Sequence, residues 1–273
     1  MFSLSTGCKE PKQEPVWENV KIGDLADRDP NQSPKANLLR TIDINVLVYE
    51  IPVENIDKLT KIRNQLFIPP LRLTSYPAFS GNSFFVRFGP GSSPDDLLNG
   101  TLSKLQAAEG QKIANVSLML SDGQPETITI TGIGGPQTVY FTGQSGSKEG
   151  AKIGPGIIGL RVRADKVEDT SGICKVVVYP VYSPLMQSPI PTLDERAKLR
   201  EFPFNSAAFG LNMSPGDFVL FGPEEYLSDQ TTLGSLVCSN PRGSMFVNES
   251  EKKLPELKPA VRIFVFICTK VSD

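Results

Sequence analysis

The sequence predicts a mainly β protein with two or three short helices, an α+β fold in which strands dominate. Several runs carry apolar residues at every second position, the period of a strand with one face in a core. Turn signals such as Ser-Asp-Gly and Ser-Pro-Gly separate these runs, whereas only two segments have apolar residues at helical spacing. With 273 residues, 39% of them hydrophobic, the chain can bury a sizeable core.

The first predicted strand and helix follow each other closely. Residues 40–51 alternate between apolar side chains and polar or exposed ones, which predicts a half-buried strand. Its inward side chains are Ile42, Ile44, Val46 and Val48. Residues 53–66 carry apolar side chains at helical spacing, so we expect a short amphipathic helix there, with Pro52 in its first turn. Pro69 and Pro70 end it.

A second helix is predicted over residues 94–109. Ser93 suits the N-cap, Pro94 the first helical position, and two aspartates lie in the first turn. Leu98, Leu102 and Leu105 give this helix one apolar face, and Gly110 is its C-terminal stop.

Beyond Gly110 nearly all regular structure is expected to be strand. The predicted runs lie near Lys112–Leu120, Glu126–Ile130, Ile158–Ala164, Ile173–Tyr182, Phe218–Phe221 and Ala260–Val271.

Two stretches beyond Gly110 do not follow the strand pattern. Thr131–Gly156 is rich in glycine around a short strand-like Thr-Val-Tyr-Phe, and Asn240–Pro259 is polar, typical of a mobile loop before the last strand.

Composition argues against nucleic-acid binding and against most catalysis. Lysine plus arginine number 28 and aspartate plus glutamate 30, and no run of like charge is long enough to grip a phosphate backbone. Histidine, the usual general base and commonest metal ligand, is absent. Acids such as Asp43, Asp165 and Asp169 fall at strand ends and turns, where solvated carboxylates are usual. We therefore expect a non-enzymatic protein without a cofactor, metal site or catalytic residue.

The four cysteines predict neither a zinc site nor a redox motif, because they form no CxxC pair and no histidine accompanies them. Cys174, Cys238 and Cys268 are expected to be buried thiols. Cys8 follows Ser-Thr-Gly, as in the last part of a bacterial lipoprotein signal, and is a candidate lipidation site. No basic and fully apolar segment precedes it, so a truncated start and an accidental match both remain open.

Two regions are predicted from these patterns. Residues 1–37 form an N-terminal lipid-attachment and tether segment, which is polar and contains Pro30 and Pro34. Residues 38–273 form one β-rich domain. An aromatic group in that domain has two readings, as a lipid-facing girdle or as the core of a sheet. Its members are Phe202, Phe204, Phe209, Phe218 and Phe221.

In their order, these elements resemble the secretin homology domain, the C-terminal module of the gated outer-membrane rings of type II, type III and type IV pilus systems. Residues 44–66 resemble its opening strand and short helix, and residues 94–130 are similar to its helix, strand, Gly-Gln turn and strand. Residues 155–182 resemble a Gly-led strand and its partner. Residues 211–221 resemble a hairpin with Gly-Asp at its turn. Thr232–Leu236 and Val261–Thr269 resemble the segment and the apolar strand that close the module, so the resemblance spans residues 40–271.

The resemblance implies antiparallel sheets and a role as a subunit of an outer-membrane secretion channel in the bacterial cell envelope. Partners would be copies of the same chain or other envelope proteins, with attachment to the outer membrane by a lipid or a barrel. The alternative is a monomeric or accessory secretin-like lipoprotein with a binding or structural role.

By the same resemblance the glycine-rich stretch would be the gate loop of the channel; the alternative is a flexible surface hairpin. The candidate gate residues are Gly132, Gly134, Gly135, Thr138, Tyr140, Gly143, Gly154 and Gly156.

Overall fold

The computed structural model describes residues 41–92, 96–168, 170–185, 201–246 and 255–272. The predicted tether and Cys8 lie outside these ranges. In the described part the fold is mainly β with short helices and antiparallel sheets, as predicted. The strands that build the two large sheets and the hairpin are β1 (Thr41–Pro52), β2 (Phe84–Gly89), β3 (Gln111–Ser121), β4 (Pro125–Ile133), β5 (Gln137–Thr142), β6 (Lys148–Ile153), β7 (Gly156–Lys166), β8 (Cys174–Pro184), β9 (Phe202–Pro203), β10 (Phe209–Met213), β11 (Phe218–Pro223), β12 (Ser239–Phe246) and β13 (Glu256–Val271).

The helices are short, and none of those described is long and apolar enough to span a membrane. They are α1 (Ile56–Arg63), α2 (Tyr76–Ser80), α3 (Leu97–Ala107) and α5 (Leu233–Cys238), with 3-10 turns η3 (Val53–Asn55) and η4 (Asn205–Ala207). The sequence pattern predicted α1 and α3 but neither α2 nor α5, which have fewer than two turns and therefore little periodicity.

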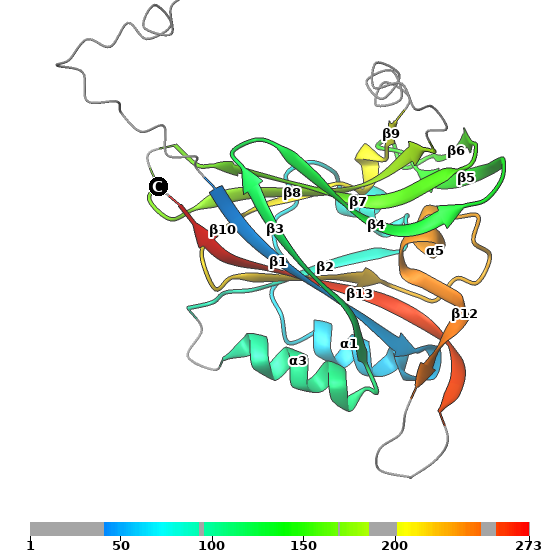
Figure 1. Ribbon diagram of the computed structural model, residues 1–273, viewed down its shortest axis with the longest axis horizontal. Coiled ribbons are helices and arrows are strands. Elements are labelled where there is room, and N and C mark those ends of the chain that lie inside the picture. Colours follow the sequence, from blue (N-terminus) through cyan, green and yellow to red (C-terminus); the bar gives the residue numbers. More distant parts are fainter. Residues whose placement is uncertain (1–40, 93–95, 169, 186–200, 247–254, 273) are drawn as a thin grey trace, which may run out of the picture. The chain divides into compact units, whose positions relative to one another are not determined.

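Two antiparallel sheets enclose the main core. The first, sheet A, has the order β2-β11-β13-β1-β3, with β12 also paired to β13; the second, sheet B, has the order β10-β8-β7-β4, with β9 paired to β8. Figure 1 shows β4, β7 and β8 on one side of sheet A and the helices α1 and α3 on the other. Sheet A is therefore covered on both faces.

The two covered faces explain the burial of β1. Ile44 and Val46 lie in the core between the sheets, while Tyr49 and Ile51 pack in a second core with Leu59 of α1. The four side chains predicted to face inward are buried, and the first half of β1 alternates as predicted. From Leu47 onward both faces of the strand are buried, because the helices cover the face that alternation alone assigned to solvent. Each fully buried side chain of this size stabilises the fold by about 1.5–3 kcal/mol.

The aromatic residues pack in these cores. Phe209 and Phe221 have ring centroids 5.5 Å apart between the sheets, and Phe218 lies in the helix-covered core. Phe204 is buried against Phe141. Phe202 alone of the five stays 38% exposed. In this fold the core reading of the cluster is the correct one.

Several local expectations differ from the structure. Asp96 caps α3 by accepting a hydrogen bond from the Asn99 backbone amide, so the helix begins later than predicted from Ser93, which lies outside the described residues. The predicted mobile loop at 240–259 contains most of strand β12 and the start of β13, which pair with each other, while residues 247–254 lie outside the described residues. Backbone pairing between β12 and β13 holds the described ends of this polar segment, which alternation cannot reveal.

The expected hairpin at residues 211–221 is also wrong. β10 pairs with β8 in sheet B, whereas β11 pairs with β2 and β13 in sheet A. The Ser-Pro-Gly-Asp turn thus carries the chain from one sheet to the other. Gly216 has a φ of 93° there, and Asp217 accepts hydrogen bonds from the backbone amides of Ser214 and Gly91.

Candidate functional site

The glycine-rich stretch folds into a two-stranded antiparallel hairpin, β5–β6, inserted between β4 and β7 of sheet B. β4 and β7 pair with each other up to Ile133 opposite Gly156, so the hairpin leaves and re-enters the sheet at one point. Its own pairing runs from Gln137 opposite Ile153 to Thr142 opposite Lys148. The sequence indicated β5 but missed β6, whose Lys-Glu-Gly-Ala-Lys-Ile has a weak strand pattern.

The hairpin has one buried and one exposed face. Val139 and Ile153 lie in the core between the sheets, and Phe141 packs against Phe202 and Phe204. On the other face the Tyr140 side chain is 52% exposed. The hairpin is therefore docked on the body of the domain, which differs from the flexible surface hairpin considered from sequence.

The side chain of Asn82 is hydrogen-bonded to the backbone of Thr142, the last residue of β5. The Asn82 side-chain amide donates to the backbone carbonyl of Thr142 at 2.9 Å, and its side-chain oxygen accepts from the Thr142 amide at 2.8 Å. The Thr142 hydroxyl donates to the carbonyl of Gly81, and the Tyr140 amide donates to the carbonyl of Thr231. Asn82 is buried. No periodicity or motif in the sequence marks it, since its partner lies 60 residues away.

The candidate gate residues occupy distinct places in this hairpin. Gly132 lies in β4, Thr138 and Tyr140 lie in β5, and Gly156 begins β7. The other four are in connections: Gly134 and Gly135 between β4 and β5, Gly143 after β5, and Gly154 between β6 and β7.

Only some of these glycines are required by packing. A Cβ at Gly156 would come within 2.6 Å of the Ser183 carbonyl oxygen and 2.3 Å of the Tyr182 ring. At Gly132, Gly134 and Gly135 a Cβ would meet no described atom within 4 Å, and their φ angles are not positive. Sterically, these three positions accept a side chain. Glycine there leaves the base of the hairpin with more conformational freedom than the fold requires.

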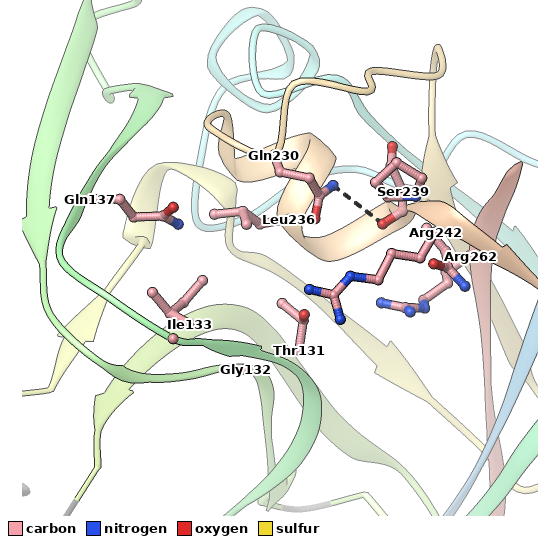
Figure 2. A pocket seen from close by; sticks show the side chains of 12 residues that line it. Thr131, Gly132, Ile133, Gln137, Gln230, Leu236, Ser239, Arg242 and Arg262 are labelled. Carbon is pink, nitrogen blue, oxygen red and sulfur yellow. Dashed lines mark hydrogen bonds between the residues drawn. The ribbon is translucent and has the colours of Figure 1, made fainter.

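A polar pocket of about 540 Å³ lies beside this base. Its walls come from the end of β4, the start of β5, the segment around α5, and strands β12 and β13. Figure 2 shows the Gln137 side chain on one side and the guanidinium groups of Arg242 and Arg262 on the other, with Gln230 above them, hydrogen-bonded to Ser239. No pattern in the sequence groups these residues, because they come from segments that are far apart along the chain.

The two arginines of the pocket differ in their partners. The Nε of Arg262 donates to the carboxylate of Glu50 at 2.8 Å, and Glu50 is only 2% exposed. Asn240 and Ser244 of β12 also donate to this carboxylate. Arg242 is exposed and forms no ion pair with any carboxylate of the described residues. The pocket therefore presents one compensated and one uncompensated positive charge beside neutral amides, an arrangement suited to an anionic group.

The described residues hold no group of three or more aspartate, glutamate or cysteine side chains placed to bind a metal ion. The three cysteines of the described part are free and buried, as predicted from the sequence. Together these features define a two-sheet β protein with a docked glycine-rich hairpin and a polar pocket at its base.

Comparison with known proteins gives few matches. No family model and no curated protein sequence matches the chain. Among solved structures, the chain is similar to the InvG secretin domain beta-barrel from the Salmonella SPI-1 injectisome, with 11% identity and a TM-score of 0.26. A second match is the secretin InvG of the Salmonella SPI-1 type III secretion injectisome, with 9% identity and a TM-score of 0.27.

Each match covers 86% of this chain, and the chain spans 64% and 65% of the two solved chains. Identity and TM-score at this level define neither a family nor an activity for this protein.

Proposed function

We propose that this chain is a non-enzymatic subunit of a secretin-type channel in a bacterial outer membrane, and that the hairpin β5–β6 is its gate. The observation that carries the proposal is the position of the hairpin. It leaves sheet B between two paired strands and is joined to β4 by glycines for which packing gives no reason. The order of strands, helices and turns along residues 40–271, which resembles the secretin module, supports the same assignment.

A gate must hold one position and be able to leave it. The contacts of the hairpin with the body suit both needs, because a few polar contacts at Asn82 and Thr231 hold β5 and a small apolar face seals it. Freeing the hairpin would break these contacts without breaking the β4–β7 ladder. Rotation about Gly134 and Gly135 would supply the hinge.

Ring formation requires a surface on which copies can associate. Strand β3 offers one, because among the described strands only β1 pairs with it, which leaves one edge of an 11-residue strand open. The side chains of Ile113 and Met119 on this strand are 47% and 71% exposed. An open edge with exposed apolar side chains is a template for pairing with another chain.

The proposal is tested by conductance across a planar lipid bilayer that contains the detergent-extracted full-length chain. A variant in which an Asn-Gly turn replaces residues 138–152 keeps the pairing of Gln137 with Ile153 and removes the gate. We expect the wild type to be closed at low voltage and the shortened variant to conduct. Equal conductance of the two, or no channel from either under conditions where both are folded, would overturn the assignment.

A second function is favoured by the outer face of sheet B. This face carries the ion pairs Arg161–Glu201 and Arg163–Asp165, which do not suit contact with lipid. A monomeric or accessory envelope lipoprotein, held by a lipid on Cys8, accounts for such a polar face. In that role the pocket beside Arg242 would bind an anionic group of another envelope component.

A further inference from the structure

Two buried cysteines meet between the sheets. Cys174 is the first residue of β8 in sheet B, and Cys268 lies near the end of β13 in sheet A. Both are fully buried, and their Sγ atoms are 3.9 Å apart. This contact joins two strands that are 94 positions apart in the sequence and that belong to different sheets.

The two thiols are chemically different. Cys174 also lies 3.5 Å from the carbonyl oxygen of Met213, to which its thiol donates. When Cys174 ionises, the thiol of Cys268 donates to its sulfur, and this hydrogen bond lowers the pKa of Cys174. The same contact raises the pKa of Cys268. In the folded chain Cys174 is therefore the sulfur that ionises first.

We propose that Cys174 and Cys268 form a disulfide that joins the two sheets when the chain folds in the presence of a disulfide oxidant. One of the two cysteines, as its thiolate, attacks the oxidant's disulfide, forms a mixed disulfide and expels one thiolate. The other cysteine then loses its proton and attacks the sulfur of the first, which releases the second thiolate. The two cysteines lose two electrons and two protons in all, and the oxidant is reduced to two thiols.

The geometry also sets when the reaction occurs. A disulfide needs sulfurs about 2 Å apart, so the two side chains must approach by roughly 2 Å more. In the folded chain neither sulfur is exposed, so an oxidant reaches them only before the sheets close. The bond is therefore a product of folding. Cys238 is also fully buried, and burial raises its pKa. Among the described cysteines, no second thiol contacts it.

The test is refolding of the full-length chain from urea in a buffer of reduced and oxidised glutathione. Free thiols are then blocked with an alkylating reagent, and the unreduced digest is mapped by mass spectrometry. We expect a peptide pair that joins Cys174 to Cys268, with Cys238 alkylated. The same pair should form in a Cys238→Ser variant. Oxidised glutathione added to the already folded, reduced chain should produce the pair at least tenfold more slowly.

Thermal unfolding gives a second readout that does not depend on substituted variants. Because the bond closes a long loop, the oxidised protein should melt roughly 5–15 °C above protein that was refolded with reductant. A refolded chain in which Cys174 and Cys268 are both alkylated, or in which either is joined to Cys238 or Cys8, would overturn the proposal.

Discussion

The Asn82 side chain is the residue on which docking of the hairpin depends most. It satisfies both the amide and the carbonyl of Thr142, and it donates in addition to the carbonyl of Ala78. We expect Asn82→Ala to lower the free energy of unfolding by about 2–4 kcal/mol, because buried backbone groups lose their partners. Urea denaturation measures this value. Asn212→Ala, at an exposed position of β10, is the matched control and should change it by less than about 0.5 kcal/mol.

A loss of stability as small for Asn82→Ala as for the control would show that the hairpin is held by its apolar face alone. Limited proteolysis can also separate the contribution of the Asn82 hydrogen bonds from that of the apolar face of the hairpin. Cleavage within residues 143–147 should accelerate in the Asn82 variant before the rest of the domain becomes sensitive.

The Glu50 carboxylate is the second residue whose removal has a specific consequence. It is buried and accepts from Arg262, Asn240 and Ser244. Glu50→Ala leaves Arg262 without its counter-ion, and we expect a loss of about 3–5 kcal/mol in the free energy of unfolding. Glu50→Gln keeps the shape of the side chain and some of its hydrogen bonds, so its loss should be smaller. Equal losses would mean that charge plays no part in this contact.

At the scale of elements, the glycines at the base of the hairpin should respond differently to the same substitution. Gly134→Ala and Gly135→Ala add a methyl group in open space and restrict the unfolded chain, so stability should stay equal or rise by up to about 1 kcal/mol. Gly156→Ala places a methyl against the Ser183 carbonyl and the Tyr182 ring and should cost about 1–3 kcal/mol. Thermal unfolding of the three variants checks this.

The gating role adds a separate expectation for the same variants. If Gly134 and Gly135 form a hinge, the double alanine variant should keep its stability and open less often in bilayer recordings. Unchanged opening in a stable double variant would contradict the hinge.

The positions of most strands could be predicted from the sequence, because strands that pack one or both faces have long apolar or alternating runs. Gln111–Ser121 and Cys174–Pro184 were predicted within two residues at either end. The partners of each strand could not be predicted in the same way. Residues 211–221 have the composition of a hairpin, yet their two strands enter different sheets, and both contribute side chains to the core between them.

Part of the candidate site could likewise be predicted from the sequence, and part of it could not. Glycine content marked the hairpin, because glycine is rare in strands and its clustering is visible in the sequence. The residues that hold the hairpin and line the pocket, such as Asn82 and Arg242, are brought there by tertiary contacts. No local pattern marks such residues. Cys8 and the tether at residues 1–37 lie outside the described residues, and their assignment stays a prediction.

At the scale of the whole molecule, the open edge of β3 connects the fold to assembly. Ile113→Lys with Met119→Lys places two charges on this edge, where both side chains are already exposed. We expect the double variant to fold with unchanged stability and to lose self-association. Lys112→Glu, at an exposed position of the same strand that is already charged, is the control and should leave association intact. Association of the double variant at the wild-type level would mean that the interface lies on another surface of the protein.

The measurement that tests the central claim most directly is the mass of the detergent-extracted particle. The full chain, expressed with a complete lipoprotein signal, is analysed by size-exclusion chromatography with light scattering. A channel subunit predicts a protein mass many times that of one chain, in a single closed assembly. A clean monomer would contradict the channel and leave a secretin-like fold in an accessory envelope role.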